Sequence, residues 1–279
     1  MPIKIVTDST CDLPEAIIQL YGITVVPLFI HFGAKDYRDG VDLSREEFYR
    51  RLPQSFPLPT TAAPGPSIFK QVYEQLARDG ATEILSIHIS ASLSATFESA
   101  RAGANETAVV PVTAIDSRQL SLGTGFIVEA AAKAAQAGQS KSDILKLIND
   151  LATRTHVFAA LDTLDYLRRS GRMNRFVAGL GTLLQLKPIV TMFNGQPGAE
   201  RVRTQARSIE RVVEMLQHAA PLERVAIVHT HAADRVAELR LRVQTVLPAT
   251  DIWSMDITPV IGAHIGPNAV GFACISAAK

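Results

Sequence analysis

Short apolar runs alternate with amphipathic segments through the first 150 residues of the chain. The apolar runs indicate buried strands and lie at residues 3–8, 23–32, 83–89 and 109–116. The segments between them have helical spacing and lie at residues 14–21, 42–52, 66–80, 94–106 and 122–138. Asp12, Pro14 and Glu15 predict a capping box before the first helix, which Gly22 ends. The alternation of strand and helix predicts an N-terminal α/β/α domain with a mostly parallel sheet.

The pattern changes after a predicted helix at residues 140–155, where strands become more closely spaced. Further strands are predicted at residues 157–161, 187–193, 223–231 and 269–277. The dipeptide Asn194-Gly195 is typical of a tight hairpin turn, which joins antiparallel strands. We therefore place a domain boundary near Thr155. The chain is expected to form an α/β domain over residues 1–155 and a second α/β domain, with a mixed sheet, over residues 156–279.

Composition excludes several classes of protein. The 279 residues are 47% hydrophobic, and the 28 basic residues nearly balance the 27 acidic ones. This balance argues against nucleic acid or an anionic membrane surface as a partner. Two cysteines, Cys11 and Cys274, fit a reducing compartment. Residues 257–278 are uncharged and long enough to span a bilayer, but their prolines and glycines break them into strand, loop and strand. We expect a cytoplasmic protein without a signal peptide or membrane helix.

Polar residues follow the predicted strands of the first domain. Asp8, Ser9 and Thr10 stand at the end of the first strand, hydroxyls recur from Ser90 to Thr96 after the third, and Asp116 ends the fourth strand. Thr60 and Thr61 precede a helix. Ligands gather at the carboxyl ends of parallel strands, and hydroxyls and free N–H groups at helix starts can bind an anion. The same residues also serve as ordinary helix caps, so both interpretations stay open.

Common catalytic motifs are missing from the sequence. It has neither the phosphate-binding G-x-x-x-x-G-K-[ST] nor the nucleophile motif G-x-S-x-G. The glycines at 123 and 125 favour close helix–sheet packing. His229 and His231, with His264, are candidate metal ligands, but local hydrogen bonding is the commoner role for such a pair, so no metal is expected. His264 lies between two glycines in a predicted loop, where it could donate a hydrogen bond to an anion or to a carbonyl.

A basic turn is followed by an apolar helix in the second half of the chain. Arg168, Arg169, Arg172 and Arg175 surround a Ser-Gly turn, which suits a solvated face or the docking of an acidic or phosphorylated partner. The helix after this turn is apolar on nearly every side through Phe176, Leu180, Leu183 and Leu184. Such a helix usually packs in a core, and its glycines would also suit a cavity wall.

The sequence resembles the DegV family along nearly its whole length. The matching segments are "IVTDSTCDLP" (5–14), "YRDGVDLSREEFY" (37–49), "TTAAPGPSIF" (60–69), "SASLSATFESA" (90–100), "IDSRQLSLGTG" (115–125), "LDYLRRSGRM" (164–173), "LKPIVTMFNG" (186–195), "RVRT" (201–204) and "GAHIGPNAVG" (262–271). The resemblance implies a two-domain fold that binds one long-chain fatty acid between its domains and buries the acyl chain in the second one. Relatives act as the lipid-carrying subunit of a fatty acid kinase, whose separate ATP-binding subunit makes the acyl phosphate.

Site residues follow from the resemblance by position. Thr61, Ser94 and the backbone N–H of Ala95 are expected to bind the carboxylate, with His264 and Arg203 nearby. Phe176, Leu180, Leu183 and Leu184 are the candidates for the acyl-chain wall, and Arg172 with Arg169 for docking of the kinase. No cofactor is expected, and phosphoryl transfer is expected on the partner, so that the chain itself is not an enzyme.

The sequence departs from the family pattern at three places. Ala95 and Asn268 stand where glycine is usual, and Ala62-Ala63 replaces Ser-Gln. The alternative function is that of a dihydroxyacetone-kinase-like subunit, which would bind a small hydroxylated or carbonyl substrate and would need a reactive His264.

Overall fold

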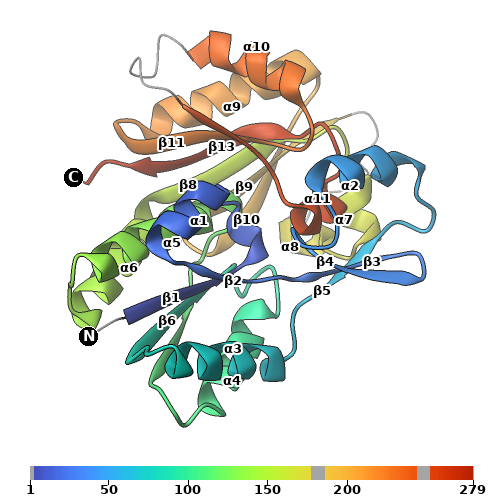
Figure 1. Cartoon of the computed structure of the whole chain (residues 1–279). Helices are drawn as coiled ribbons and strands as arrows, with labels where there is room; N and C mark the ends of the chain where they lie inside the picture. Colours follow the sequence, from blue (N-terminus) through green and yellow to red (C-terminus); the bar gives the residue numbers. More distant parts are fainter. Residues whose placement is uncertain (1–2, 177–185, 244–251, 279) are drawn as a thin grey trace.

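Two β-sheets and three layers of helices form the body of the molecule (Figure 1). The computed structural model describes residues 3–176, 186–243 and 252–278. From bottom to top in Figure 1, the layers are a helix pair, a four-stranded sheet, a central helical layer, a six-stranded sheet and a second helix pair. This arrangement confirms the predicted α/β class. The first half of the chain contains a parallel sheet, and the second half contains a mixed sheet.

The four-stranded sheet is entirely parallel and has the order β2-β1-β6-β7. Its strands are β1 (Ile3–Asp8), β2 (Thr24–Val26), β6 (Glu83–His88) and β7 (Val112–Asp116). Helices α3 (Pro66–Arg78) and α4 (Thr96–Asn105) cover its outer face, where Phe69 and Tyr73 are fully buried. Because helices cover both faces of β1 and β6, these strands are buried along most of their length, including their polar residues Thr7, Asp8, Ser86 and His88.

The six-stranded sheet has the order β10-β9-β8-β13-β11-β12, and all its neighbours are antiparallel except β11 and β12. Its strands are β8 (Thr155–Ala160), β9 (Lys187–Phe193), β10 (Gln196–Val202), β11 (Leu222–His229), β12 (Trp253–Asp256) and β13 (Val270–Ser276). Helices α9 (Gln205–Ala219) and α10 (Ala233–Val243) cover its outer face. The predicted hairpin is confirmed, because Asn194 and Gly195 both have positive φ and join β9 to β10. Strand β12 is short and was not predicted.

The central helical layer lies between the two sheets and joins them. It consists of α1 (Glu15–Tyr21), α5 (Ser121–Gln136) and α6 (Lys141–Arg154). Added Cβ atoms at Gly123 and Gly125 would lie 2.6 Å from Val157 and 2.4 Å from the Cys11 carbonyl oxygen, so these glycines allow the predicted close packing. One hydrophobic core runs from Leu85 through this layer to Val157. The sheets change at Thr155, and the division into domains at that residue stays a prediction.

A third, small sheet stands beside the layers, with order β4-β3-β5. Its strands are β3 (Phe29–Phe32), β4 (Lys35–Arg38) and β5 (Thr60–Ala62). The remaining described helices are α2 (Arg45–Arg51), α7 (Asp165–Arg169), α8 (Met173–Phe176) and α11 (Pro259–Ile265), together with 3₁₀ turns at Ser9–Cys11 and Leu52–Gln54. Among them, α11 packs against β3 and β5 of the small sheet. The prediction of one strand over residues 23–32 is wrong, because Pro27 separates β2 and β3 and the two strands enter different sheets.

Two local predictions need correction. The segment that contains His264 is a helix, α11, which begins at Pro259 in the first-turn position that favours proline. Helix α1 begins after Pro14 without a side-chain cap, and Asp12 instead lies buried in a left-handed conformation with φ 54°. Among the helices in the described ranges, none is both long and apolar enough to cross a membrane.

Candidate ligand-binding cavity

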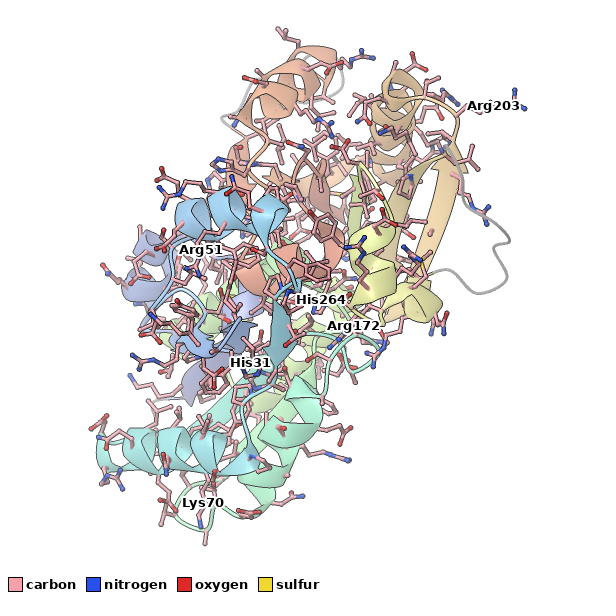
Figure 2. The ribbon with its side chains drawn as sticks, turned by 90° about the vertical axis from the view of Figure 1, so that its right-hand side faces the viewer. His31, Arg51, Lys70, Arg172, Arg203 and His264 are labelled. Carbon is pink, nitrogen blue, oxygen red and sulfur yellow. The ribbon has the colours of Figure 1, made fainter. Side chains whose placement is uncertain are left out.

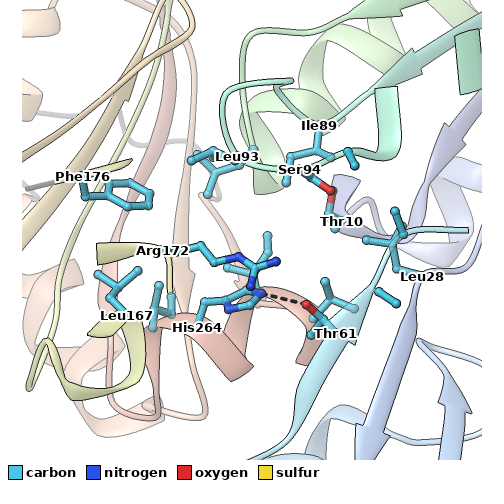
Figure 3. A pocket seen from close by; sticks show the side chains of 17 residues that line it. Thr10, Leu28, Thr61, Ile89, Leu93, Ser94, Leu167, Arg172, Phe176 and His264 are labelled. Atoms are coloured by element: carbon cyan, nitrogen blue, oxygen red, sulfur yellow. Dashed lines mark hydrogen bonds between the residues drawn. The ribbon is translucent and has the colours of Figure 1, made fainter. Parts of the chain in front are cut away.

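A cavity of about 130 Å³ opens where the small sheet, the loop before α4 and helices α7, α8 and α11 meet (Figure 3). Twelve of its seventeen lining residues are apolar or alanine. The polar lining residues are Thr10, Thr61, Ser94, Arg172 and His264. The cavity therefore combines a polar region with an apolar wall, as a site for an amphipathic ligand requires.

Thr61 and His264 come from distant parts of the chain and meet across this cavity. Thr61 lies in β5, opposite Ile30 of β3, and His264 lies in the last turn of α11. Their Oγ1 and Nε2 atoms are 2.9 Å apart and form a hydrogen bond, as Figure 3 shows. With the imidazole proton on Nε2, His264 donates to the Thr61 oxygen and leaves the Thr61 hydroxyl proton available for a ligand.

His264 is held in its neutral form. Burial, followed by the positive charges of Arg172 and Arg175, lowers the pKa of its imidazole from 6.5 to about 3. Its Nδ1 atom is buried and has no hydrogen-bond partner among the described residues. Because the His264 ring is neutral, Arg172 carries the only positive charge among the described residues that line the cavity.

Ser94 and Ala95 lie in the loop between β6 and α4. The Ser94 hydroxyl is 2.8 Å from the Thr96 hydroxyl and also accepts a hydrogen bond from the Thr96 N–H at 3.3 Å. Ala95 adopts φ −78° and ψ 0°, an ordinary right-handed conformation, so the alanine that replaces glycine here causes no backbone strain. Of the alternating hydroxyls noted in the sequence, Ser90 and Ser92 bond to each other and only Ser94 lines the cavity.

Thr10 also lines the cavity, and Asp8 fixes its orientation. The Asp8 carboxylate accepts hydrogen bonds from the Thr10 N–H at 3.0 Å and from its hydroxyl at 2.5 Å. The other carboxylate oxygen accepts from the Ile89 N–H at 3.0 Å. Because the Thr10 hydroxyl proton is engaged by Asp8, Thr10 shapes the cavity but has no proton left to donate to a ligand.

A buried polar chain continues from Asp8 through His88 and Ser86 to Tyr73. The contacts are 3.0 Å from Asp8 to His88, 2.7 Å from His88 to Ser86 and 2.8 Å from Ser86 to Tyr73. The order of carboxylate, imidazole and hydroxyl is that of a hydrolase triad. All four side chains are fully buried and none lines the cavity, so this chain of hydrogen bonds holds β1, β6 and α3 together.

Arg172 is the one charged residue among the described residues that line the cavity. Its Nη1 atom donates to the Ser170 carbonyl oxygen at 2.7 Å, and Figure 2 shows it close to His264. The sequence suggested Arg172 for partner docking, and its place in the cavity wall was missed. Arg169 is exposed on α7. Arg203 is exposed at the edge of the molecule and is not brought to the cavity (Figure 2).

The apolar wall continues into a deeper cavity of about 30 Å³ beneath α11. The two cavities share four lining residues, namely Leu120, Phe176, Ile261 and Ile265. The deeper one ends against the inner face of the six-stranded sheet at Val157, Ala159, Val190, Met192 and Val228. Phe176 thus lies at the cavities, as the sequence suggested, whereas Leu180, Leu183 and Leu184 lie outside the described residues. The sequence indicated that these strand residues are apolar and buried, but not that they line a cavity.

The other two candidate metal-ligating histidines lie elsewhere. His229 and His231 have Nδ1 atoms 3.6 Å and 3.8 Å from the two carboxylate oxygens of Asp256. Neither histidine lines the cavity with His264. Within the described part of the chain, no group of three or more His, Cys, Asp or Glu side chains is placed to hold a metal ion.

Comparison with known proteins gives one consistent family. The model of the family described as "Uncharacterised protein, DegV family" matches residues 2–277. A DegV domain-containing protein from Streptomyces coelicolor is 35% identical over 274 residues, which are 96% of each chain.

Solved structures of the same family have the same fold. A DegV family protein from Thermus thermophilus, described by its fatty acid binding, has a TM-score of 0.90 and 33% identity, with 99% of this chain and 100% of that chain covered. DegV from Bacillus subtilis, described as a fatty acid binding protein, has a TM-score of 0.90 and 30% identity, with 99% of each chain covered.

Proposed function

Since the chain belongs to the DegV family, we propose that it binds one long-chain fatty acid and presents the carboxylate to a separate kinase subunit. One observation carries the first part of this proposal. The cavity has polar donors and a single cation at one end and an apolar extension at the other, without an acidic residue among the described lining residues. This distribution suits an anionic head group on a long apolar tail.

The head group is assigned to the polar end of the cavity. In this assignment the Thr61 and Ser94 hydroxyls and the Ala95 N–H donate to the carboxylate oxygens. His264 supports Thr61 through its Nε2–H, and Arg172 supplies the compensating positive charge. Paired donors matter because an unpaired buried carboxylate is costly, whereas hydrogen bonds to a charged group each stabilise by roughly 1.5–3 kcal/mol.

The acyl chain is assigned to the apolar wall and the deeper cavity. It enters beside Phe176, passes Ile261 and Ile265, and ends at the inner face of the six-stranded sheet near Met192. Each buried methylene contributes about 0.8 kcal/mol, so about a dozen contribute on the order of ten kcal/mol before the costs of association. Most of the affinity therefore comes from the tail, and the head-group donors fix its orientation.

Binding of a matched pair of ligands to delipidated protein tests this assignment. Palmitate is expected to bind in a one-to-one ratio. Its methyl ester has the same tail without the charge and should bind at least tenfold more weakly, because it gains no charge-assisted hydrogen bonds. Equal affinity for the acid and the ester would contradict the head-group assignment. Saturable binding of dihydroxyacetone with no binding of palmitate would instead favour the small-substrate alternative.

Presentation to a kinase is the second part of the proposal. The carboxylate end of the cavity lies beside Arg172, with Arg169 exposed on the neighbouring helix, so a negatively charged phosphoryl group would find positive charge there. In the reaction a carboxylate oxygen attacks the γ-phosphorus of ATP, which gives acyl phosphate and ADP.

An ADP assay tests this part of the proposal. Protein loaded with palmitate and mixed with the ATP-binding subunit of a fatty acid kinase should form ADP in proportion to bound palmitate. Formation of ADP at the same rate with empty protein would contradict this part.

A further inference from the structure

A buried carboxylate joins three of the segments that line the cavity. Asp12 is 1% exposed and lies just after the turn that carries Thr10. Its Oδ2 atom accepts a hydrogen bond from the Ser121 hydroxyl at 2.6 Å, and Ser121 follows the cavity residue Leu120. Its Oδ1 atom accepts from the Thr258 N–H at 2.8 Å, and Thr258 directly precedes α11. One side chain thus ties together segments separated by up to 246 residues.

Asp12 also makes an ion pair with α2. The Arg45 Nη2 atom lies 3.1 Å from Asp12 Oδ1, and the Arg45 side chain is 37% exposed, so the pair reaches from the interior to the surface. Burial raises the pKa of Asp12 to about 6, and Arg45, Ser121 and Thr258 each act to lower it. All of the hydrogen bonds that hold Asp12 therefore favour its charged form.

The start of α11 is fixed from further directions by the same N-terminal part of the chain. The Thr258 hydroxyl donates to the buried Asp39 carboxylate at 2.5 Å, and the Tyr49 hydroxyl donates to the Ile257 carbonyl oxygen at 2.8 Å. Tyr49 then packs against α11 itself, because a Cβ atom at Gly262 would lie 2.4 Å from its hydroxyl. Helix α11 contributes Val260, Ile261, His264 and Ile265 to the cavity, so its position determines much of the cavity's shape.

We propose that Asp12 is a positioning residue for ligand binding, which holds α11 so that the Nδ1 atom of His264 stays buried and its ring stays bonded to Thr61. Asp12 does not line the cavity, so it acts through α11 and not on the ligand. A residue that fixes α11 matters here because Thr61 and His264 lie 203 residues apart in the sequence. The hydrogen bond between them depends on the position of α11 relative to β5. This proposal rests on the proposed function for the identity of the ligand. Its first test is made on the ligand-free protein.

That readout is the titration of the His264 ring, followed by NMR in the ligand-free protein. The charged groups that depress its pKa are Arg172, before α8, and Arg175, in α8, and burial contributes most. If Asp12 holds α11 in place, Asp12→Asn lets water reach the ring, and the pKa of His264 should rise toward its ordinary value. Asp116→Asn is the matched control, because Asp116 accepts an Arg118 N–H in a turn and does not line the cavity. It should leave the titration unchanged.

Affinity for palmitate is the second readout. Asp12→Asn should weaken palmitate binding at least tenfold while circular dichroism shows a folded protein, and Asp12→Glu should restore part of the affinity. A folded Asp12→Asn protein with unchanged His264 titration and unchanged affinity would overturn the proposal. If the wild-type protein does not bind palmitate, the proposed function fails, and the His264 titration still decides whether Asp12 positions α11.

A second variant covers the case in which Asp12→Asn does not fold. Thr258 has φ −57°, which suits proline, so Thr258→Pro removes the N–H that Asp12 accepts while it keeps this backbone angle. Thr258→Val is its control, since it removes only the hydroxyl that bonds to Asp39. A higher pKa of His264 in Thr258→Pro than in Thr258→Val supports the proposal. Equal titration curves in the two variants would overturn it.

Discussion

His264 and Thr61 lie 203 residues apart in the sequence, yet their side chains are joined by a hydrogen bond of 2.9 Å at the wall of the cavity. Thr61 lies in β5, a three-residue strand of the small sheet, and His264 lies in the last turn of α11. The bond places a hydroxyl proton, a neutral ring and a nearby guanidinium at one end of an apolar cavity.

Ser94→Ala should weaken palmitate binding by about tenfold, because one hydrogen bond to a charged group is lost. Ser92→Ala is the matched control. Ser92 lies in the same loop, but its hydroxyl bonds to Ser90 and it does not line the cavity. Titration calorimetry on delipidated proteins compares the two variants. Equal affinities for Ser94→Ala and Ser92→Ala would remove Ser94 from the head-group site.

Acid should destabilise the protein through His264. The pKa of its imidazole is about 3 in the folded protein and about 6.5 when unfolded, so between these values only the unfolded chain takes up the proton. The stability that depends on the neutral ring is present above pH 6.5 and is lost as pH falls. Relative to pH 7.5, the loss at pH 5 is roughly 2 kcal/mol.

His264→Gln isolates this contribution, because all other titrating groups are shared with the wild type. Urea unfolding at pH 7.5 and pH 5 should show the wild type losing roughly 2 kcal/mol relative to the variant. If the free energies of unfolding of the wild type and His264→Gln differ by the same amount at both pH values, His264 titrates normally in the folded protein.

The closed end of the deeper cavity should limit acyl-chain length. Met192 is 1% exposed and lines this end on the inner face of β9. Met192→Ala should shift the preference toward longer fatty acids and lower the free energy of unfolding by about 2–5 kcal/mol. Competition among saturated fatty acids of graded length measures the shift. Met215→Ala on the outer helix α9 is the control and should keep the wild-type preference. The same order of preference in both variants would place the chain end elsewhere.

Gly262 should not tolerate a side chain. A Cβ atom there would lie 2.4 Å from the Tyr49 hydroxyl, whereas a Cβ atom at Gly65, which has negative φ, would have no neighbour within 4 Å. Gly262→Ala should lower the free energy of unfolding by about 1–3 kcal/mol through overpacking, and Gly65→Ala should change it little. Thermal unfolding of the two variants tests how closely α11 packs on α2. Equal midpoints would contradict this packing.

Much of the fold could be predicted because apolar periodicity reports burial. The strands β1, β6, β8, β9, β11 and β13 all come from apolar runs, and Asn194-Gly195 marked its hairpin correctly. The prediction failed where tertiary contacts override local signals. Pro27 divides a continuous apolar run between two sheets, and α11 forms in a segment whose glycines indicated a loop. Those glycines are needed instead for close approach to Tyr49 and Tyr166.

The cavity could be predicted less completely than the fold. Thr61, Ser94, Ala95 and His264 follow from family resemblance, and the structure places all four around one cavity. Arg203, which was expected near them, is exposed, and the cation that lines the cavity with these four residues is Arg172. Asp12 carried the local signal of a helix cap, and only the tertiary fold shows that its carboxylate bonds to Arg45, Ser121 and Thr258. Such contacts join residues whose pairing leaves no pattern in a single sequence.

Native mass spectrometry of the purified protein, followed by identification of any molecule released on denaturation, tests the proposed fatty acid binding most directly. We expect one fatty acid per chain, which defines the length of the acyl chain at the same time. The complex should persist in Ser92→Ala and be weakened in Ser94→Ala. A wild-type protein that carries no lipid and takes up neither palmitate nor oleate would contradict the proposed function.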